Sequence, residues 1–245
     1  MAPFDGSTPF PTTLVRSCLG QPLRPGQMGV LLARAGVGKT ACLTHIALEA
    51  LAQGEKVLHT CIDELPDKIK IWYDELYRNF KTAIADEDLL KTIKDGMVSS
   101  RFIMSYMHHT FTPAKLEENI RSLRDQVQFE PTVIILDGLD FERVPRKQLE
   151  AIQRTAEIYG ASVWFSCRIH RHIDIANDHG IPYPCHELDD LFEAIILLEP
   201  TAQTISMVVL KHGDRYKPDH AALVLNPRTF LLAQANEGLR AQGLS

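Results

Sequence analysis

The sequence predicts a single α/β domain in which a mostly parallel central sheet is flanked by helices and ends in antiparallel strands. Short β-type runs alternate with longer helical stretches, which is typical of parallel strands joined by helical crossovers. The 245 residues, 45% of them hydrophobic, suffice for one large core and are too few for two comfortable ones. Near the end of the chain, three apolar runs have no helical stretch between them, which indicates an antiparallel edge.

The first half of the chain contains three predicted strands and four predicted helices. Glycine and proline set several of the boundaries, because Gly54 ends the first helix and Pro113 opens the fourth. In chain order we expect strand 28–33, helix 38–53, strand 56–62, helices 66–81 and 86–95, strand 101–106 and the helix that begins at Pro113.

The second half begins with a strand over 132–137 that is apolar without alternation, as expected for a strand covered on both faces. A helix over 146–159 and a strand over 161–167 follow, separated by Gly160. The three antiparallel strands are expected at 193–198, 204–211 and 221–225. Residues 1–13, rich in proline, serine and threonine, are interpreted as a flexible arm, so the folded domain is expected to cover 14–245.

A glycine-rich segment between the first strand and the first helix is the strongest chemical signal. It reads Ala-Arg-Ala-Gly-Val-Gly-Lys-Thr over 33–40, and a strand before it and a helix after it are the context that a phosphate-binding P-loop requires. Gly36 and Gly38 allow backbone N–H groups to converge on a phosphate, and the helix presents its positive end to the anion. Lys39 would reach the β- and γ-phosphates, and the Thr40 hydroxyl would bind Mg²⁺. Ala33 stands where the usual first glycine would be.

A second signal lies about a hundred residues later. Asp137 ends an apolar strand, which is the position of the Walker B carboxylate that holds Mg²⁺. Alone it would be weak, because many buried strands end in aspartate. Together with the P-loop it predicts binding of ATP or ADP with Mg²⁺. The residues expected to contact the nucleotide are Ala35, Gly36, Val37, Gly38, Lys39, Thr40 and Ala41, and those expected to bind the metal are Thr40 and Asp137.

Two adjacent acids, Asp63 and Glu64, end the strand that follows the P-loop helix. The stretch 57–69, an apolar strand with two acids and a proline-containing helix start, resembles the KaiC family of RecA-like P-loop ATPases. In that family a carboxylate at this strand end polarises the attacking water. The resemblance therefore implies that Glu64 is the base and that Asp63 assists, although which acid takes the role stays open, and both could instead cap the next helix.

The resemblance to KaiC- and DnaB-like ATPases extends over roughly residues 14–226. It includes the entry into the first strand from Gly20, and Ser166 at the position of the polar sensor of the γ-phosphate. It also includes the segment 208–215, which resembles the finger through which a Lys and an Arg reach the nucleotide of a neighbouring subunit. This implies that Lys211 and Arg215 act in trans, but three residues separate them here and one separates them in the family.

The resemblance implies a Mg²⁺-dependent ATPase that works as a homo-oligomer, for example a hexameric ring, and switches the binding of an unknown protein partner. One alternative is a motor or recombinase that nucleic acid stimulates, and another is a nucleotide-gated scaffold with little turnover. The net charge of −5 argues against a nucleic-acid binder. Two basic loops, 141–147 and 168–172, keep that alternative open, although we interpret them as solvated loops.

Other classes of site and location find little support in the sequence. Five cysteines and several histidines have no spacing of a closed zinc site. No apolar run is long enough to span a bilayer, and the first residues do not have the order of a signal peptide, so we expect a cytoplasmic protein without a membrane contact. No guanine-reading motif is present, which favours ATP over GTP.

Overall fold

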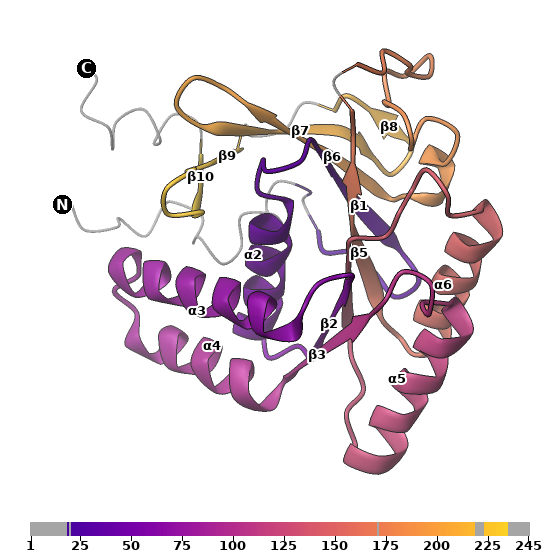
Figure 1. Cartoon of the computed structure of the whole chain (residues 1–245). Helices are drawn as coiled ribbons and strands as arrows, with labels where there is room; N and C mark the ends of the chain where they lie inside the picture. The colour runs from indigo at the N-terminus through magenta and orange to yellow at the C-terminus, as the bar shows by residue number, and fades with distance from the viewer. Residues whose placement is uncertain (1–18, 20, 171, 219–222, 235–245) are drawn as a thin grey trace.

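The fold is an α/β arrangement built on one mixed, mostly parallel sheet with helices on both faces (Figure 1). A computed structural model describes residues 19, 21–170, 172–218 and 223–234. The predicted arm 1–13 and the first two residues of the predicted strand 221–225 lie outside these ranges. No helix in the described ranges is both long and apolar enough to cross a membrane.

The strands of the sheet follow the spatial order β10-β9-β7-β6-β1-β5-β4-β2-β3, and β8 pairs with β7. The six strands from β6 to β3 run parallel, whereas the pairs β6–β7, β7–β9 and β9–β10 are antiparallel. The strands are β1 (Met28–Ala33), β2 (Val57–Ile62), β3 (Arg101–Tyr106), β4 (Val133–Asp137), β5 (Ser162–Arg168), β6 (Ala194–Pro200), β7 (Ile205–His212), β8 (Arg215–Tyr216), β9 (Leu223–Leu225) and β10 (Leu232–Gln234).

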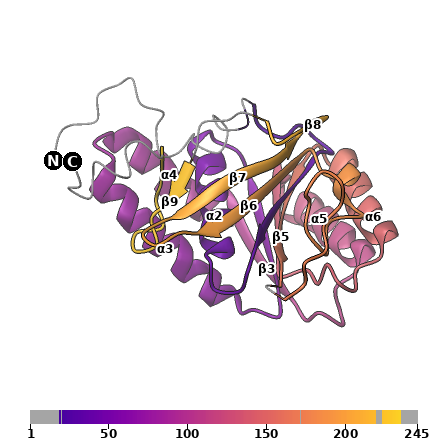
Figure 2. The same ribbon diagram turned by 90° about the horizontal axis from the view of Figure 1, so that it is seen from above.

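The helices form one layer on each face of the sheet. They are α2 (Lys39–Ala52), α3 (Pro66–Ala83), α4 (Glu87–Ser99), α5 (Pro113–Val127) and α6 (Arg146–Ile158), with a short 3₁₀ helix η1 (Asp189–Leu191). Figure 1 shows α2, α3 and α4 on one side and α5 and α6 on the other, and Figure 2 shows the same division from above. Alternate residues of a strand enter opposite layers, so Leu31 joins the core beneath α2 while Leu32 joins the core beneath α6.

The predicted α/β organisation is confirmed, and two local expectations were wrong. The helix expected at 86–95 continues to Ser99. The strand expected at 193–198 in the antiparallel edge pairs antiparallel with β7, but on its other side it pairs in parallel with β1. The crossover from β5 to β6 contains no α-helix among its described residues, only the 3₁₀ turn, so the sequence offered no helical signal that a parallel pairing followed.

Two fully buried histidines stand out in the core. Neither ring nitrogen of His45, in α2, has a hydrogen-bond partner in the described chain, and the ring packs edge-on against Phe80 with centroids 5.1 Å apart. Nδ1 of His59, in β2, lies 3.0 Å from the hydroxyl of Tyr73. Burial lowers the pKa of His45 to about 3 and that of His59 to about 4, since a charged imidazolium would lose its hydration.

We expect the free energy of unfolding to fall between pH 7 and pH 5, by roughly 2 kcal/mol for each of these histidines. Both folded-state pKa values lie below the ordinary 6.5, so the unfolded chain takes up the protons first and stability present above pH 6.5 is lost as the pH falls. Urea unfolding at pH 7, 6 and 5 measures this loss. In His45→Leu the loss should be about 2 kcal/mol smaller, because this variant lacks one of the two buried histidines. The surface carboxylates titrate equally in both proteins and cancel in the comparison. An unchanged pH dependence in that variant would contradict the assignment.

Candidate functional site

The loop between β1 and α2 lies at the carboxyl end of the sheet and opens the candidate site. Residues 34–38 form the loop, and the helix begins at Lys39. Gly36 and Gly38 have φ angles of 76° and 108°, in the left-handed region that favours glycine. No side chain caps the start of α2, so the N–H groups of its first turn remain available to an anion. Ala33 ends β1 with strand backbone, which an alanine adopts without strain.

Lys39 is the cation of this loop. Its Nζ donates hydrogen bonds of 3.0 Å to the carbonyl oxygens of Ala33 and Arg34, so the ammonium turns back onto its own loop. Burial is the main cause that lowers the pKa of Lys39, while the carboxylate of Asp137 opposes the shift. A partly desolvated ammonium with only neutral carbonyl partners would gain electrostatic energy if a phosphate oxygen replaced one of them.

Asp137 joins the loop to the ends of two neighbouring strands. Its Oδ2 accepts a hydrogen bond from the Thr40 hydroxyl at 2.7 Å, and its Oδ1 accepts one from the Ser166 hydroxyl at 2.5 Å. Ser166 in turn accepts the N–H of Gly138 at 2.9 Å. Asp137 is 9% exposed, so this carboxylate is nearly buried and both of its oxygens are hydrogen-bonded. A carboxylate beside a hydroxyl offers hard oxygen ligands of the kind that Mg²⁺ prefers.

A closed metal site does not form within the described ranges. No three His, Cys, Asp or Glu side chains gather there in a way that could hold a metal ion. A Mg²⁺ ion that binds one carboxylate, one hydroxyl and the oxygens of a phosphate needs no such cluster. The pairing of Thr40 with Asp137 therefore fits Mg²⁺ bound together with a nucleotide.

Asp63 and Glu64 lie at the same edge of the sheet, because Cys61 pairs with Asp137 in the register of β2 and β4. Asp63 adopts a left-handed φ of 56°, and its Oδ1 accepts the backbone N–H of His108 at 2.7 Å. The Glu64 carboxylate forms an ion pair with Lys68, in the first turn of α3. Neither acid lines the cavity described next. The structure thus brings both acids to the expected edge with their carboxylates engaged elsewhere.

A cavity of about 430 Å³ opens beside Lys39, Asp137 and Ser166. Its walls come from the loops that follow β4 and β5, and they include Glu142, Arg168 and His170 as well as the loop residue Ala35. This volume lies in the range of small-molecule pockets. From the sequence, Arg168 is predicted only as part of a basic loop, because no local motif marks its place on the cavity wall.

The basic loop 141–147 is less positive than its composition suggests. The guanidinium of Arg143 lies 3.5 Å from a carboxylate oxygen of Asp140, and Nε2 of His170 lies 2.6 Å from an oxygen of Glu142. Arg146, at the start of α6, pairs with Asp190. The ion pairs of Arg143 and Arg146 lower the positive charge of the loop 141–147. Arg171 lies outside the described residues.

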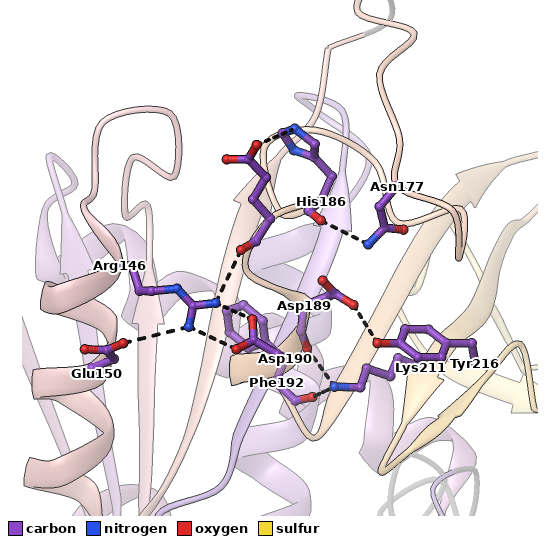
Figure 3. A network of polar contacts seen from close by, with 10 residues as sticks. Arg146, Glu150, Asn177, His186, Asp189, Asp190, Phe192, Lys211 and Tyr216 are labelled. Atoms are coloured by element: carbon purple, nitrogen blue, oxygen red, sulfur yellow. Dashed lines mark hydrogen bonds and ion pairs between the residues drawn. The ribbon is translucent and has the colours of Figure 1, made fainter.

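Lys211 lies inside its own chain. It is 6% exposed, and its Nζ donates to the carbonyl oxygens of Asp189 at 2.7 Å and Phe192 at 2.9 Å (Figure 3). Arg215, by contrast, is exposed on β8. In this structure Lys211 is therefore not the projecting side chain that the family resemblance implies.

The position of Lys211 follows from an irregularity in β7. Val209 pairs with Ile196, but Ile195 pairs with Lys211 rather than Leu210, so one extra residue bulges from β7. Because strand residues alternate between faces, the bulge moves Lys211 to the face that carries Ile195 and Phe192. The sequence already indicates that this segment differs from the family pattern, because three residues separate Lys211 from Arg215 where the family has one.

A polar network around Lys211 attaches residues 187–192, the end of the connection between β5 and β6, to the rest of the domain. The Tyr216 hydroxyl donates to Asp189 Oδ2 at 2.6 Å, a contact that raises the pKa of Tyr216 to about 12. On the other side of the segment, both terminal nitrogens of Arg146 donate to Asp190, and Glu150 lies 3.8 Å from the same guanidinium (Figure 3). The segment is thereby held to α6 at one side and to the β7–β8 hairpin at the other.

Comparisons with known proteins give this site no family name. No model of a known protein family matches the chain, and no curated protein matches it. The geometry of the site is therefore the basis for any assignment of function.

We expect Ser166→Ala to lower the free energy of unfolding by about 2 kcal/mol, because it removes a hydrogen bond to a nearly buried carboxylate. Ser162→Ala is the matched control on the same strand, since its hydroxyl makes only a 3.5 Å contact with the Thr132 carbonyl oxygen. It should cost less than about 1 kcal/mol. Chemical denaturation of both variants gives the comparison, and equal losses would show that Asp137 does not depend on Ser166.

Proposed function

We propose that this protein is a RecA-like P-loop ATPase, closest to the KaiC- and DnaB-like ATPases, which binds ATP with Mg²⁺ and hydrolyses it. The observation that carries the proposal is the 2.7 Å hydrogen bond from the Thr40 hydroxyl to Asp137, residues 97 positions apart in the chain. These two side chains are the Mg²⁺ ligands of the P-loop and Walker B motifs, and their contact supports a shared metal site.

The arrangement around α2 supports a triphosphate as the ligand. Gly36 and Gly38 give the loop the left-handed turns that point successive N–H groups at one anion, and the uncapped start of α2 adds its partial positive charge. Lys39 would exchange its carbonyl partners for β- and γ-phosphate oxygens. Bound Mg²⁺, held by Thr40 and Asp137, would supply charge neutralisation at the phosphates.

Hydrolysis requires a water molecule and a carboxylate base at the γ-phosphate. The water oxygen forms a bond to the γ-phosphorus while the bond from that phosphorus to the β,γ-bridging oxygen breaks, and ADP leaves with the electron pair. The water proton passes to the base, which we assign to Glu64 with Asp63 assisting. In this structure both carboxylates have other partners, so we propose that nucleotide binding releases one of them.

We further propose that the protein acts as a homo-oligomer in which turnover switches the binding of a protein partner. Arg215, which is exposed on β8, is available to the nucleotide of a neighbouring chain. The ion pairs of Arg143 and Arg146 favour this regulator over a motor driven by nucleic acid, because they lower the positive charge of the loop 141–147.

Lys39→Ala should abolish detectable ATP binding and turnover, because it removes the ammonium that holds the β- and γ-phosphates. Isothermal titration with ATP and a steady-state phosphate-release assay provide the two measurements, each with and without single-stranded DNA. Lys91→Ala, an exposed lysine on α4, is the control and should behave as the unmodified protein. Turnover that persists in Lys39→Ala would refute the ATPase proposal, and a large increase with DNA would favour the motor.

Substitution of the two acids should identify the base. Glu64→Gln is expected to lower turnover about 10²–10⁴-fold with little change in ATP affinity, because only proton transfer is removed. Asp63→Asn keeps an acceptor for the His108 N–H and a residue that tolerates left-handed backbone, so its smaller effect should appear in turnover and not in stability. The reverse order of effects would assign the base to Asp63, and unchanged turnover in both variants would place it elsewhere.

A further inference from the structure

Arg168 stands beside the first residue of the phosphate loop. It is the last residue of β5, its Cα pairs with that of Ala33, and the N–H of the following Ile169 donates to the Ala33 carbonyl at 3.1 Å. Because strand side chains alternate, Arg168 projects from the same face of β5 as Ser166, whose hydroxyl binds Asp137. The backbone thus presents a guanidinium next to both the loop and the carboxylate.

The Arg168 side chain is exposed and lines the cavity that begins at Lys39. Burial is the main cause that lowers the pKa of Lys39, and the positive charge of Arg168 acts in the same direction, which agrees with two cations facing one space. The other charged residues of the wall have partners of their own, since Asp140 faces Arg143 and Glu142 faces His170. Among the described residues, no carboxylate forms an ion pair with Arg168.

An uncompensated guanidinium beside the phosphate loop has a chemical use in phosphoryl transfer. Negative charge shifts between the γ-phosphate and the leaving oxygen during the reaction, and an arginine that contacts these oxygens stabilises the transition state. The planar guanidinium can donate two hydrogen bonds to neighbouring phosphate oxygens. Lys211, the residue expected to reach a neighbour's nucleotide, is held inside its own chain.

We propose that Arg168 is a catalytic residue that contacts the γ-phosphate of the ATP bound by its own chain. The inference rests on the proposed ATPase function and deepens it. One chain then supplies two positively charged side chains to the phosphates of its own ATP, Lys39 from the phosphate loop and Arg168 from the end of β5.

A transition-state analogue tests the contact without relying on turnover. Arg168→Ala should bind ADP within about twofold of the unmodified protein but should bind ADP with aluminium fluoride at least tenfold more weakly, because the guanidinium acts on the γ-position. Arg168→Lys should recover part of this affinity, since it retains a charge without the fork of donors. Turnover of Arg168→Ala should fall about 10³-fold or more. Arg154→Ala, an exposed arginine on α6, is the matched control for loss of a surface guanidinium.

Mixed proteins test whether the contact is made within one chain. A mixture of Arg168→Ala, which retains Lys39, with Lys39→Ala, which retains Arg168, should show no more turnover than the two variants alone. Recovered turnover in the mixture would overturn the inference, because it would show that Arg168 acts on a neighbouring chain. So would equal losses of affinity for ADP and for ADP with aluminium fluoride, or unchanged affinity for both. If the unmodified protein binds no nucleotide, the ATPase proposal itself fails.

Discussion

The carboxylate of Asp137 is the point at which the parts of the candidate site meet. Parallel strands end at one edge of a sheet, so β1, β4 and β5 deliver a loop, an acid and a hydroxyl to the same place. A nearly buried carboxylate is stable only if its oxygens accept hydrogen bonds, and Thr40 and Ser166 provide one each. This requirement fixes the start of α2 against the ends of β4 and β5, and it also determines where Lys39 lies.

Most of the fold could be predicted because most of the parallel crossovers contain a helix, whose apolar periodicity is visible in the sequence. The apolar run 132–137 became the buried strand β4, and the run 101–106 matches β3 residue for residue. The direction of strand pairing was harder to predict. The sequences of β6 and β7 are both those of apolar strands, although β6 pairs in parallel with β1 and β7 pairs antiparallel with β6. Direction of pairing depends on contacts between distant segments, and a connection without a helix conceals it.

The parts of the candidate site that depend on backbone connectivity could be predicted from the sequence. The parts that depend on contacts between distant side chains could not. The loop 34–38 and the Thr40–Asp137 pair follow from strand–loop–helix connectivity and from the order of the motifs. The interior position of Lys211 depends on a bulge at Leu210, which shifts the face of a side chain without changing its residue type. The engagement of Asp63 by the His108 N–H is likewise a contact between segments 45 residues apart, which spacing alone could not reveal.

The described ends of the connection between β5 and β6 are each fixed by contacts with other elements, and this affects ligand binding. Lys211 and Tyr216 hold one side of residues 187–192 and Arg146 holds the other, so this end of the connection is fixed without an α-helix. Fixing the backbone of a residue costs roughly 1–2 kcal/mol of conformational entropy. At the other end of the connection, the Ile169 N–H binds the Ala33 carbonyl oxygen and His170 Nε2 lies 2.6 Å from Glu142, so folding has already met part of that cost for the cavity wall before a ligand enters.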